Sequence, residues 1–320
     1  MNKNNTLYIV VPCYKEQEVL PETSKRLKAK LQTLIAQGKV SQKSRIMFVN
    51  DGSSDNTWPM IAELHEKDPA VFSGVNLSRN RGHQNAVLAG MLTAVNFADM
   101  IITMDADLQD DINAVDGMVD AYHEGYEVVY GVRSKRDTDT FFKRFTAEGF
   151  YKVMKALGVD IVFNHADYRL MSRRAVEGLA QFTEVNLFLR GIVPQIGYKW
   201  TTVTYERAER FAGESKYPLK KMLAFAADGI TSFSVKPIRL VFSIGVVVFL
   251  VSLVMLLYAL ISKILGYAHA GWTSLMGSIW LIGGIQLLSL GVVGEYIGKI
   301  YNETKRRPRF IIESVLNQEE

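Results

Sequence analysis

The sequence of 320 residues contains a single cysteine, Cys13. One cysteine excludes an internal disulfide and cannot by itself build a metal site, so we interpret Cys13 as a small residue at a strand end rather than a nucleophile. The N-terminal stretch MNKNNTLYIVV also lacks the pattern of a signal peptide, because it passes directly into an apolar strand. We therefore expect the chain to start in the cytoplasm.

Two common nucleotide-binding motifs are missing as well. No GxGxxG follows the first apolar strand, and the sequence contains no GxxxxGKS/T. These absences argue against a dinucleotide-binding fold and against a P-loop ATPase. A nucleotide site in this chain would have to be built from other side chains.

Formal charge is absent from two long segments near the C-terminus, 240–261 and 272–294. At about 1.5 Å per residue, each segment spans about 33 Å as a helix, which is enough to cross a hydrocarbon core of about 30 Å. Buried core helices are the alternative, but such helices keep a polar face, and these segments hold only scattered Ser, Gly and Gln286. We predict two transmembrane helices, over 238–262 and 272–297.

Basic residues flank these segments on their outer sides. Five precede the first segment and five follow the second: Lys216, Lys220, Lys221, Lys236, Arg239, Lys299, Lys305, Arg306, Arg307 and Arg309. The connector 262–271 holds only Lys263 and His269 as basic residues. By the positive-inside rule, we expect both termini on the cytoplasmic side of an inner (plasma) membrane and the connector outside. The net charge of +4 comes largely from the flanking residues, which favours anionic membrane lipids and argues against nucleic acid as a partner.

The remaining boundaries follow from composition. The stretch KYPLKKMLAFAADGITSFSVKP mixes lysine with Leu, Phe, Met and Ile, as a helix at a membrane interface would, with a plain linker as the alternative. We therefore predict a cytoplasmic domain over 1–212, juxtamembrane interfacial helices over 213–237 and a cytoplasmic tail over 298–320. Gly283 and Gly284 could pack helix against helix, which is compatible with a homo-oligomer.

The first 130 residues alternate between short β-rich runs and charged segments with helical spacing. Five runs are predicted strands: LYIVV (7–11), RIMFVN (45–50), FSGVNL (72–77), MIITMD (100–105) and EVVYG (127–131). Such alternation is typical of βαβ units, so we predict an α/β fold with a mostly parallel sheet. In open α/β sheets the ligand binds at the carboxyl ends of the strands, which is where the site is expected.

The fourth predicted strand ends in an acidic stretch, TMDADLQDD. Carboxylates and a diphosphate repel one another unless a divalent cation lies between them, and Mg²⁺ or Mn²⁺ with oxygen ligands meets that need. In an extended segment alternate residues point the same way, so Asp105, Asp107 and Gln109 are predicted to converge on one ion. An isolated DxD is a weak signal, but its place after a buried strand strengthens it.

Six stretches carry a resemblance to a known family: VPCYKEQE (11–18), VNDGSSDNT (49–57), LSRNRGHQNAVLAG (77–90), MDADLQD (104–110), ADYRLMSRRAV (166–176) and ERFAGESKY (209–217). Followed by two predicted spans, they resemble the family-two GT-A glycosyltransferases, and among these the polyprenyl-phosphate branch, which includes dolichol-phosphate mannose synthases and bactoprenol glycosyltransferases. The resemblance implies a Rossmann-like GT-A catalytic domain. It also implies transfer of one sugar from a nucleotide donor to the phosphate of a membrane lipid, usually with inversion.

The resemblance also implies roles for individual residues on the donor side of the site. It places Asp105 beside the ribose or the metal, and Asp107 and Gln109 on the metal. It places four further residues around the nucleotide: Pro12, Tyr14, Glu16 and Asp51.

Other roles concern catalysis and the acceptor. Asp167, in a match to the family's D-F/Y-R-L, is grouped with the catalytic residues and is accompanied by Arg169, although the two could form a structural ion pair. Arg133 resembles an arginine that meets the acceptor phosphate, with a solvated loop residue as the alternative. We assign no catalytic role to His83 or His165. Three residues match the R-x-x-G-x-S-K-Y segment, whose donors would clamp phosphate, with Arg210 and Lys216 taken as catalytic: Arg210, Ser215 and Lys216.

The chemistry implied by the resemblance is internally consistent. A phosphate monoester has a second pKa of about 6, so at neutral pH it carries a nucleophilic oxyanion and needs no general base. We expect a UDP-sugar as donor and undecaprenyl phosphate as acceptor. Two rival functions are a processive polysaccharide synthase, which would need a QxxRW motif and more spans, and a non-catalytic membrane scaffold, which should have lost the acidic residues.

Overall fold

The computed structural model describes residues 4–133, 165–185, 188–206, 236–264 and 271–317. The described chain divides into an α/β unit and a helical unit, each considered by itself below. Arg210, Ser215 and Lys216 lie outside the described residues, as do residues 213–235 of the predicted interfacial segment 213–237, whose last two residues belong to a helix described below.

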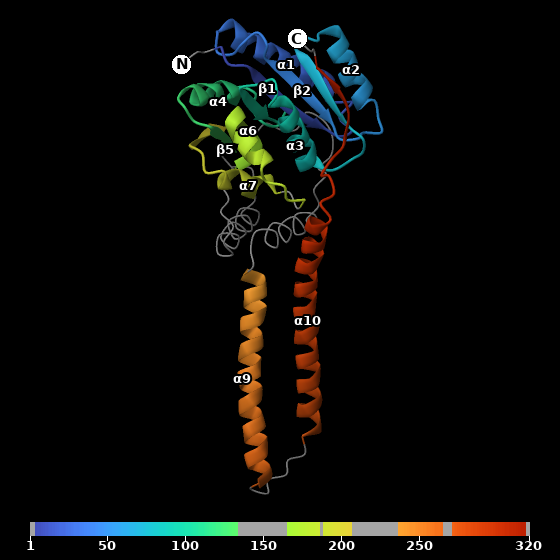
Figure 1. Ribbon diagram of the computed structural model, residues 1–320, viewed down its shortest axis with the longest axis vertical. Coiled ribbons are helices and arrows are strands. Elements are labelled where there is room, and N and C mark those ends of the chain that lie inside the picture. The colour runs from blue at the N-terminus through green and yellow to red at the C-terminus, as the bar shows by residue number, and fades with distance from the viewer. Residues whose placement is uncertain (1–3, 134–164, 186–187, 207–235, 265–270, 318–320) are drawn as a thin grey trace. The chain divides into compact units, whose positions relative to one another are not determined.

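The α/β unit begins with alternating strands and helices (Figure 1). Its first nine elements are β1 (Leu7–Cys13), α1 (Leu20–Ala36), β2 (Arg45–Asn50), α2 (Thr57–Lys67), β3 (Phe72–Leu77), α3 (His83–Ala94), β4 (Met100–Thr103), α4 (Ala114–His123) and β5 (Val128–Arg133). The later elements are β6 (His165–Ser172), α6 (Arg173–Ala180), α7 (Leu189–Gln195), β7 (Trp200–Tyr205) and β8 (Ile312–Leu316).

The eight described strands form one sheet in the order β7-β5-β6-β4-β1-β2-β3-β8. β6 runs antiparallel to β4 and β5, and β8 runs antiparallel to β3, while the other neighbours are parallel. The predicted mostly parallel α/β sheet is therefore confirmed. β2 and β3 have the predicted bounds, whereas β4 ends at Thr103, two residues early.

Helices cover both faces of this sheet because its central strands are apolar on both sides. Ile9 and Val11 of β1 belong to one core with buried residues of α1, α2 and α4. Val10, on the opposite face of β1, packs against α3, where a Cβ on Gly90 would lie 2.4 Å from Val10 Cγ1. Only glycine lets α3 approach the sheet this closely.

Three strands were not predicted: β6, β7 and β8. β8 lies within the segment 298–320 that we expected to be a tail, and it adds an edge strand beside β3. Its neighbourhood is tied further by the Ser78 amide, which donates to the Ile311 carbonyl at 3.0 Å. The chain after the predicted spans thus returns to the α/β unit as part of its sheet.

The helical unit contains α9 (Lys236–Ile264) and α10 (Trp272–Thr304), at the positions where two transmembrane helices were predicted (Figure 1). Within the described residues, one helical stretch, Leu281–Thr304, is long and apolar enough to cross a membrane. Large apolar side chains such as Leu287 and Leu290 are 73% and 67% exposed on it. Two membrane spans therefore remain a prediction.

Candidate functional site

The acidic stretch after β4 forms a turn at the carboxyl end of the sheet. An extended segment was predicted here, but residues 106–108 form a turn, and Leu108 has a left-handed φ of 57°. The apolar side chains drive this shape, because Ala106 and Leu108 are buried while Asp105, Asp107 and Gln109 stay partly exposed. Alternate residues are thus buried and partly exposed within a turn rather than a strand, and the convergence of Asp105, Asp107 and Gln109 on one ion stays a prediction.

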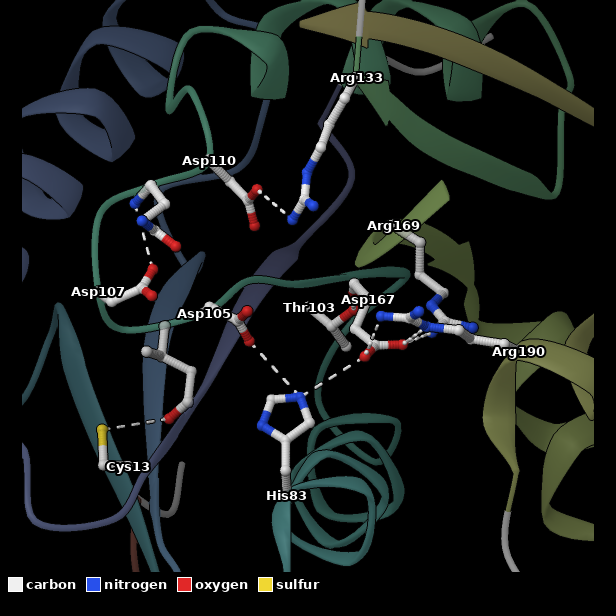
Figure 2. Close-up of polar contacts among 12 residues, drawn as sticks. Cys13, His83, Thr103, Asp105, Asp107, Asp110, Arg133, Asp167, Arg169 and Arg190 are labelled. Atoms are coloured by element: carbon white, nitrogen blue, oxygen red, sulfur yellow. Dashed lines mark hydrogen bonds and ion pairs between the residues drawn. The ribbon is translucent and has the colours of Figure 1, made fainter. Parts of the chain in front are cut away.

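Asp167 lies next to this turn because β6 pairs antiparallel with β4. The Thr103 hydroxyl donates to the Asp167 backbone carbonyl at 2.6 Å, which joins the end of β4 to the start of β6. The carboxylate of Asp167 faces the same region as Asp105 (Figure 2). A segment about 60 residues further along the chain is thereby brought to the acidic turn.

Two arginines bind the Asp167 carboxylate. Arg169, which is 1% exposed, donates from Nη2 to Oδ1 at 2.7 Å, so the ion pair considered from sequence is present. Arg190 of α7 donates from Nε to Oδ1 at 3.2 Å and from Nη2 to Oδ2 at 3.1 Å. Burial raises the pKa of Asp167, but Arg190, Arg169 and His83 outweigh it and hold the pKa well below its ordinary value. Asp167 is therefore a fixed anion at neutral pH.

Arg190 was missed by the sequence analysis. The signal in the sequence was a charged residue inside an otherwise apolar stretch, LFLRGIV. Its partner lies 23 residues earlier, so only the fold brings the two together. Arg190 remains one-third exposed and is thus accessible to a ligand.

His83, the first residue of α3, lies between two carboxylates (Figure 2). Its Nε2 is 3.5 Å from Asp105 Oδ1 and 3.8 Å from Asp167 Oδ2. Partial burial raises the pKa of Asp105, an effect that His83 opposes and that Asp167 and Asp107 reinforce. A nearby cation would stabilise the ionised form of a carboxyl in this setting.

Arg133 belongs to a second polar group beside the acidic turn. Its Nη2 lies 3.8 Å from Asp110 Oδ1, and Tyr205 donates its hydroxyl to the same oxygen at 2.5 Å. Burial, then the charge of Asp105, raises the pKa of Asp110 to about 6. The side chain of Arg133 is 30% exposed and contacts both Asp110 and the Tyr205 hydroxyl, so it is not fully solvated.

Residues predicted to surround the nucleotide lie at the end of β1 and directly after β1 and β2. Asp51, which is buried, accepts hydrogen bonds from the backbone amides of Arg81 at 2.7 Å and Gly82 at 2.9 Å. It thereby fastens the loop after β3. Gly52 has a φ of 59°, and a Cβ there would lie 2.4 Å from the backbone of Arg79, so the two loops meet at a glycine.

The other three lie at the end of β1 and in the loop that follows it. Pro12 is buried within β1, while Tyr14 is 39% exposed. The Glu16 backbone amide donates to the Thr57 hydroxyl at 3.0 Å, which ties this loop to the start of α2. Sequence reasoning therefore selected residues that occupy one end of the sheet.

The donors predicted for a divalent cation fit it in kind. Asp105, Asp107 and Gln109 offer carboxylate and amide oxygens, which Mg²⁺ and Mn²⁺ prefer. Asp107 Oδ1 also accepts the Gln109 backbone amide at 3.2 Å. Among the residues that the structure describes, no three His, Cys, Asp or Glu side chains form a metal cluster. In proteins, Mg²⁺ commonly takes one or two carboxylates and completes its shell with substrate phosphates and water.

Comparison with known proteins covers nearly the whole chain. Residues 8–179 match the model described as Glycosyl transferase family 2, and residues 236–300 match the one described as GtrB C-terminal hairpin. The uncharacterized glycosyltransferase YkoT of Bacillus subtilis is 52% identical over 314 residues, which cover 98% of this chain and 93% of that protein.

Two further relatives carry functional names. The prophage bactoprenol glucosyl transferase homolog of Escherichia coli is 40% identical over 309 residues, which cover 96% of this chain and 98% of that protein. The bactoprenol glucosyl transferase of Shigella phage SfV is 39% identical over 308 residues, which cover 96% and 97%. The resemblance drawn from sequence motifs is confirmed, and the chain belongs to glycosyl transferase family 2 as a glycosyltransferase.

Proposed function

We propose that this protein transfers one sugar from a nucleotide-sugar donor to the phosphate of a polyprenyl lipid, with undecaprenyl phosphate as acceptor. Relatives named bactoprenol glucosyl transferase, aligned over nearly their full length, support this acceptor class. A UDP-sugar is the donor that we propose, and a glucosyl donor is the first to test. A lipid phosphate oxygen attacks the anomeric carbon, the bond to the nucleotide diphosphate breaks, and the configuration inverts.

The state of Asp167 carries this proposal. A sugar hydroxyl acceptor would need a general base near neutrality, whereas a phosphate monoester already bears its oxyanion. Asp167, paired with Arg190 and Arg169, has a lowered pKa and is a poor proton acceptor at neutral pH. A site whose central carboxylate holds arginines instead of taking protons suits a phosphate nucleophile.

The described cations suit the task of bringing two anions together. Arg133 reaches toward Asp110 of the acidic turn and Arg190 toward the neighbouring Asp167 (Figure 2), and each is about one-third exposed. We assign Arg190 to one of the phosphates, with Asp167 fixing its orientation, and Arg133 to the acceptor phosphate. Arg210, Ser215 and Lys216 are proposed to complete this set by binding phosphate and stabilising developing charge.

A divalent cation, Mg²⁺ or Mn²⁺, is part of the proposal. Asp105 and Asp107 would hold it, with Gln109 as a further oxygen donor. When bound, the cation would neutralise charge on the diphosphate and make it a better leaving group. The nucleotide itself would be received by Pro12 at the end of β1 and by the loops that contain Tyr14, Glu16 and Asp51.

The acceptor requires a membrane location, because a long isoprenoid does not leave the bilayer readily. We propose two spans in an inner membrane, with the catalytic domain and both termini cytoplasmic. The match of residues 236–300 to a C-terminal hairpin, the apolar stretch Leu281–Thr304 and the flanking basic residues support this. Homo-oligomerisation through small residues of α10 is a compatible arrangement.

The test is direct product formation. Purified protein in detergent would be incubated with undecaprenyl phosphate, Mn²⁺ and, one at a time, radiolabelled UDP-glucose, UDP-N-acetylglucosamine and a GDP-sugar. We expect one labelled lipid that resists removal by water washes and requires the lipid phosphate. Label released as free sugar, or label built into a polymer, would contradict the proposal.

A further inference from the structure

The edge strand β8 contains a bulge opposite β3. Asn76 pairs with Ser314, but Leu77 pairs with Ile312, so the register shifts by one residue and Glu313 is the extra residue of β8. A bulge re-aims the side chain of its extra residue, and bulges are common beside functional sites. Here the carboxylate of Glu313 accepts a hydrogen bond from Asn76 Nδ2 at 2.8 Å.

That contact begins a chain of hydrogen bonds toward the loops after β2 and β1. Asn50 Nδ2 donates to Asn76 Oδ1 at 2.7 Å, and the Ser53 backbone amide donates to Asn50 Oδ1 at 3.2 Å. The Lys15 backbone amide then donates to the Ser53 hydroxyl at 3.0 Å. Both asparagines are buried, at 2% and 9% exposure, whereas Glu313 is exposed, so the Asn50–Asn76 hydrogen bond is the one that water cannot readily replace.

The carboxylate of Glu313 determines which group donates and which accepts in each of these hydrogen bonds. An ionised carboxylate only accepts hydrogen bonds, so Asn76 must present its NH₂ group to it and its oxygen to Asn50. Asn50 must then donate to that oxygen, which leaves its own oxygen for the Ser53 amide. A donor at position 313 would favour the reverse orientation of Asn76, which places two NH₂ groups face to face.

The series of hydrogen bonds ends at Lys15, which has an unusual backbone conformation. Lys15 has a left-handed φ of 55°, which is rare for a residue with a side chain, and its amide is held by Ser53. Tyr14 and Glu16, which we place around the nucleotide, are its direct neighbours. The hydrogen bonds thus connect the orientation of the two asparagine amides to the loop that we place around the nucleotide.

We propose that Glu313 is a positioning residue for nucleotide binding. From the bulge of β8, it fixes the orientation of Asn76 and Asn50 and thereby the loops at Ser53 and Lys15. This inference rests on the proposed function in one respect, namely that these loops receive the nucleotide. It gives the C-terminal strand a role in donor affinity rather than in the chemical step.

A charge reversal with a designed rescue tests the proposal. Glu313→Lys makes position 313 a donor, and we expect the KM for the nucleotide-sugar and the Kd for UDP to rise about tenfold, with kcat within about twofold. In Glu313→Lys with Asn76→Asp, the new carboxylate accepts from both the introduced ammonium group and Asn50, so both constants should return to within about threefold of the original. Glu313→Gln, which retains an acceptor, should show less than about a threefold change.

Amide hydrogen exchange separates this proposal from the proposed function, because it needs neither donor nor lipid. Peptides containing Lys15 and Ser53 should exchange faster in Glu313→Lys and at the original rate in the rescued double variant. Val315→Lys, which adds a cation to the same strand outside the chain of hydrogen bonds, is the matched control and should change neither exchange nor affinity. If Glu313→Lys does not fold, Glu313→Ala takes its place in the exchange and UDP measurements, with a rise in Kd of at least about threefold expected.

Three results would overturn the proposal: unchanged exchange and affinity in Glu313→Lys, equal losses in Val315→Lys, or no rescue by Asn76→Asp in a folded double variant. A protein that shows the exchange pattern but forms no glycolipid would instead contradict the proposed function alone.

Discussion

Arg190 donates two hydrogen bonds to Asp167, one to each carboxylate oxygen, at 3.2 and 3.1 Å. Paired donation of this kind fixes the plane of the guanidinium as well as its position. The buried Arg169 binds the same carboxylate. Asp167 is therefore held in place and supports the more exposed Arg190. We therefore expect substitutions of Arg190 and of Asp167 to lower kcat to different extents.

Removing the arginine should impair the chemical step. For Arg190→Ala we expect kcat to fall about 100-fold to 1,000-fold, since it removes a charged donor from a partly desolvated site. Asp167→Asn, which loosens Arg190 without removing it, should cost about 10-fold to 100-fold in kcat. Arg174→Ala, which breaks an exposed ion pair with Glu127, is the control and should retain full activity.

The pH dependence separates positioning from proton transfer. The lowered pKa of Asp167 means that the folded protein keeps this carboxylate ionised throughout the neutral range. The kcat of Asp167→Asn should therefore be reduced by the same factor at every pH from about 6 to 8. A limb of the pH–rate profile that disappears in Asp167→Asn would show that this carboxyl exchanges a proton during turnover.

Asp107→Ala should abolish turnover without unfolding the protein. The residue is partly exposed and, in the proposed mechanism, supplies an oxygen to a cation rather than supporting the core. We expect kcat to fall by about 1,000-fold or more, and excess EDTA to inactivate the original protein to a similar extent. Asp111→Asn, four residues further on, should stay active with the same melting temperature. Full activity of Asp107→Ala, or of the original protein in EDTA, would remove the metal-dependent mechanism.

Cys13 should report unfolding. Burial, followed by the charges of Glu16 and Asp55, raises the pKa of its thiol far above the ordinary value, and the side chain is 1% exposed. At about pH 7.5 we expect alkylation of the native protein to be at least about 100-fold slower than alkylation in denaturant. Rapid labelling of the native protein would show that the end of β1 opens.

The raised pKa of Cys13 also makes the free energy of unfolding depend on pH, and the direction of this dependence can be predicted. Above about pH 8.5 the thiol of the unfolded chain loses its proton, while that of the folded chain keeps it. Stability should therefore decline as pH rises from about 8.5 to 10. In Cys13→Ala the decline over this interval should be smaller when melting temperatures are compared, and an equal decline would assign it to other groups.

Membrane topology can be tested with reporters. A reporter fused after Glu320 should report cytoplasm, and one inserted near Tyr267 should report the outside, because basic residues flank the outer ends of the two predicted spans. Both reporters on the same side would mean that the two apolar segments do not each cross the membrane.

The α/β fold was predictable because its central strands are short apolar runs that need no distant partner to be recognised. β2 and β3, buried along nearly their whole length, match their predicted bounds. β6, with the sequence HADYRLMS, mixes polar and apolar residues, and it is a strand because β4 and β5 lie on either side of it. β8 is a five-residue edge strand whose partner β3 lies far earlier in the chain.

In the candidate site, too, some features follow from the sequence and others only from the tertiary structure. The sequence by itself determined that Asp51 and Asp107 follow apolar strands and that Asp105 stands at the end of one, because an apolar run that ends in carboxylates is a local pattern. Tertiary structure decided which charges meet: Arg190 with Asp167, His83 with Asp105, and Glu313 with Asn76 across 237 positions of the chain. Hydrophobic periodicity is local and can be read along the chain, whereas an ion pair or hydrogen bond depends on angstrom-scale distances that the packed sheet alone sets.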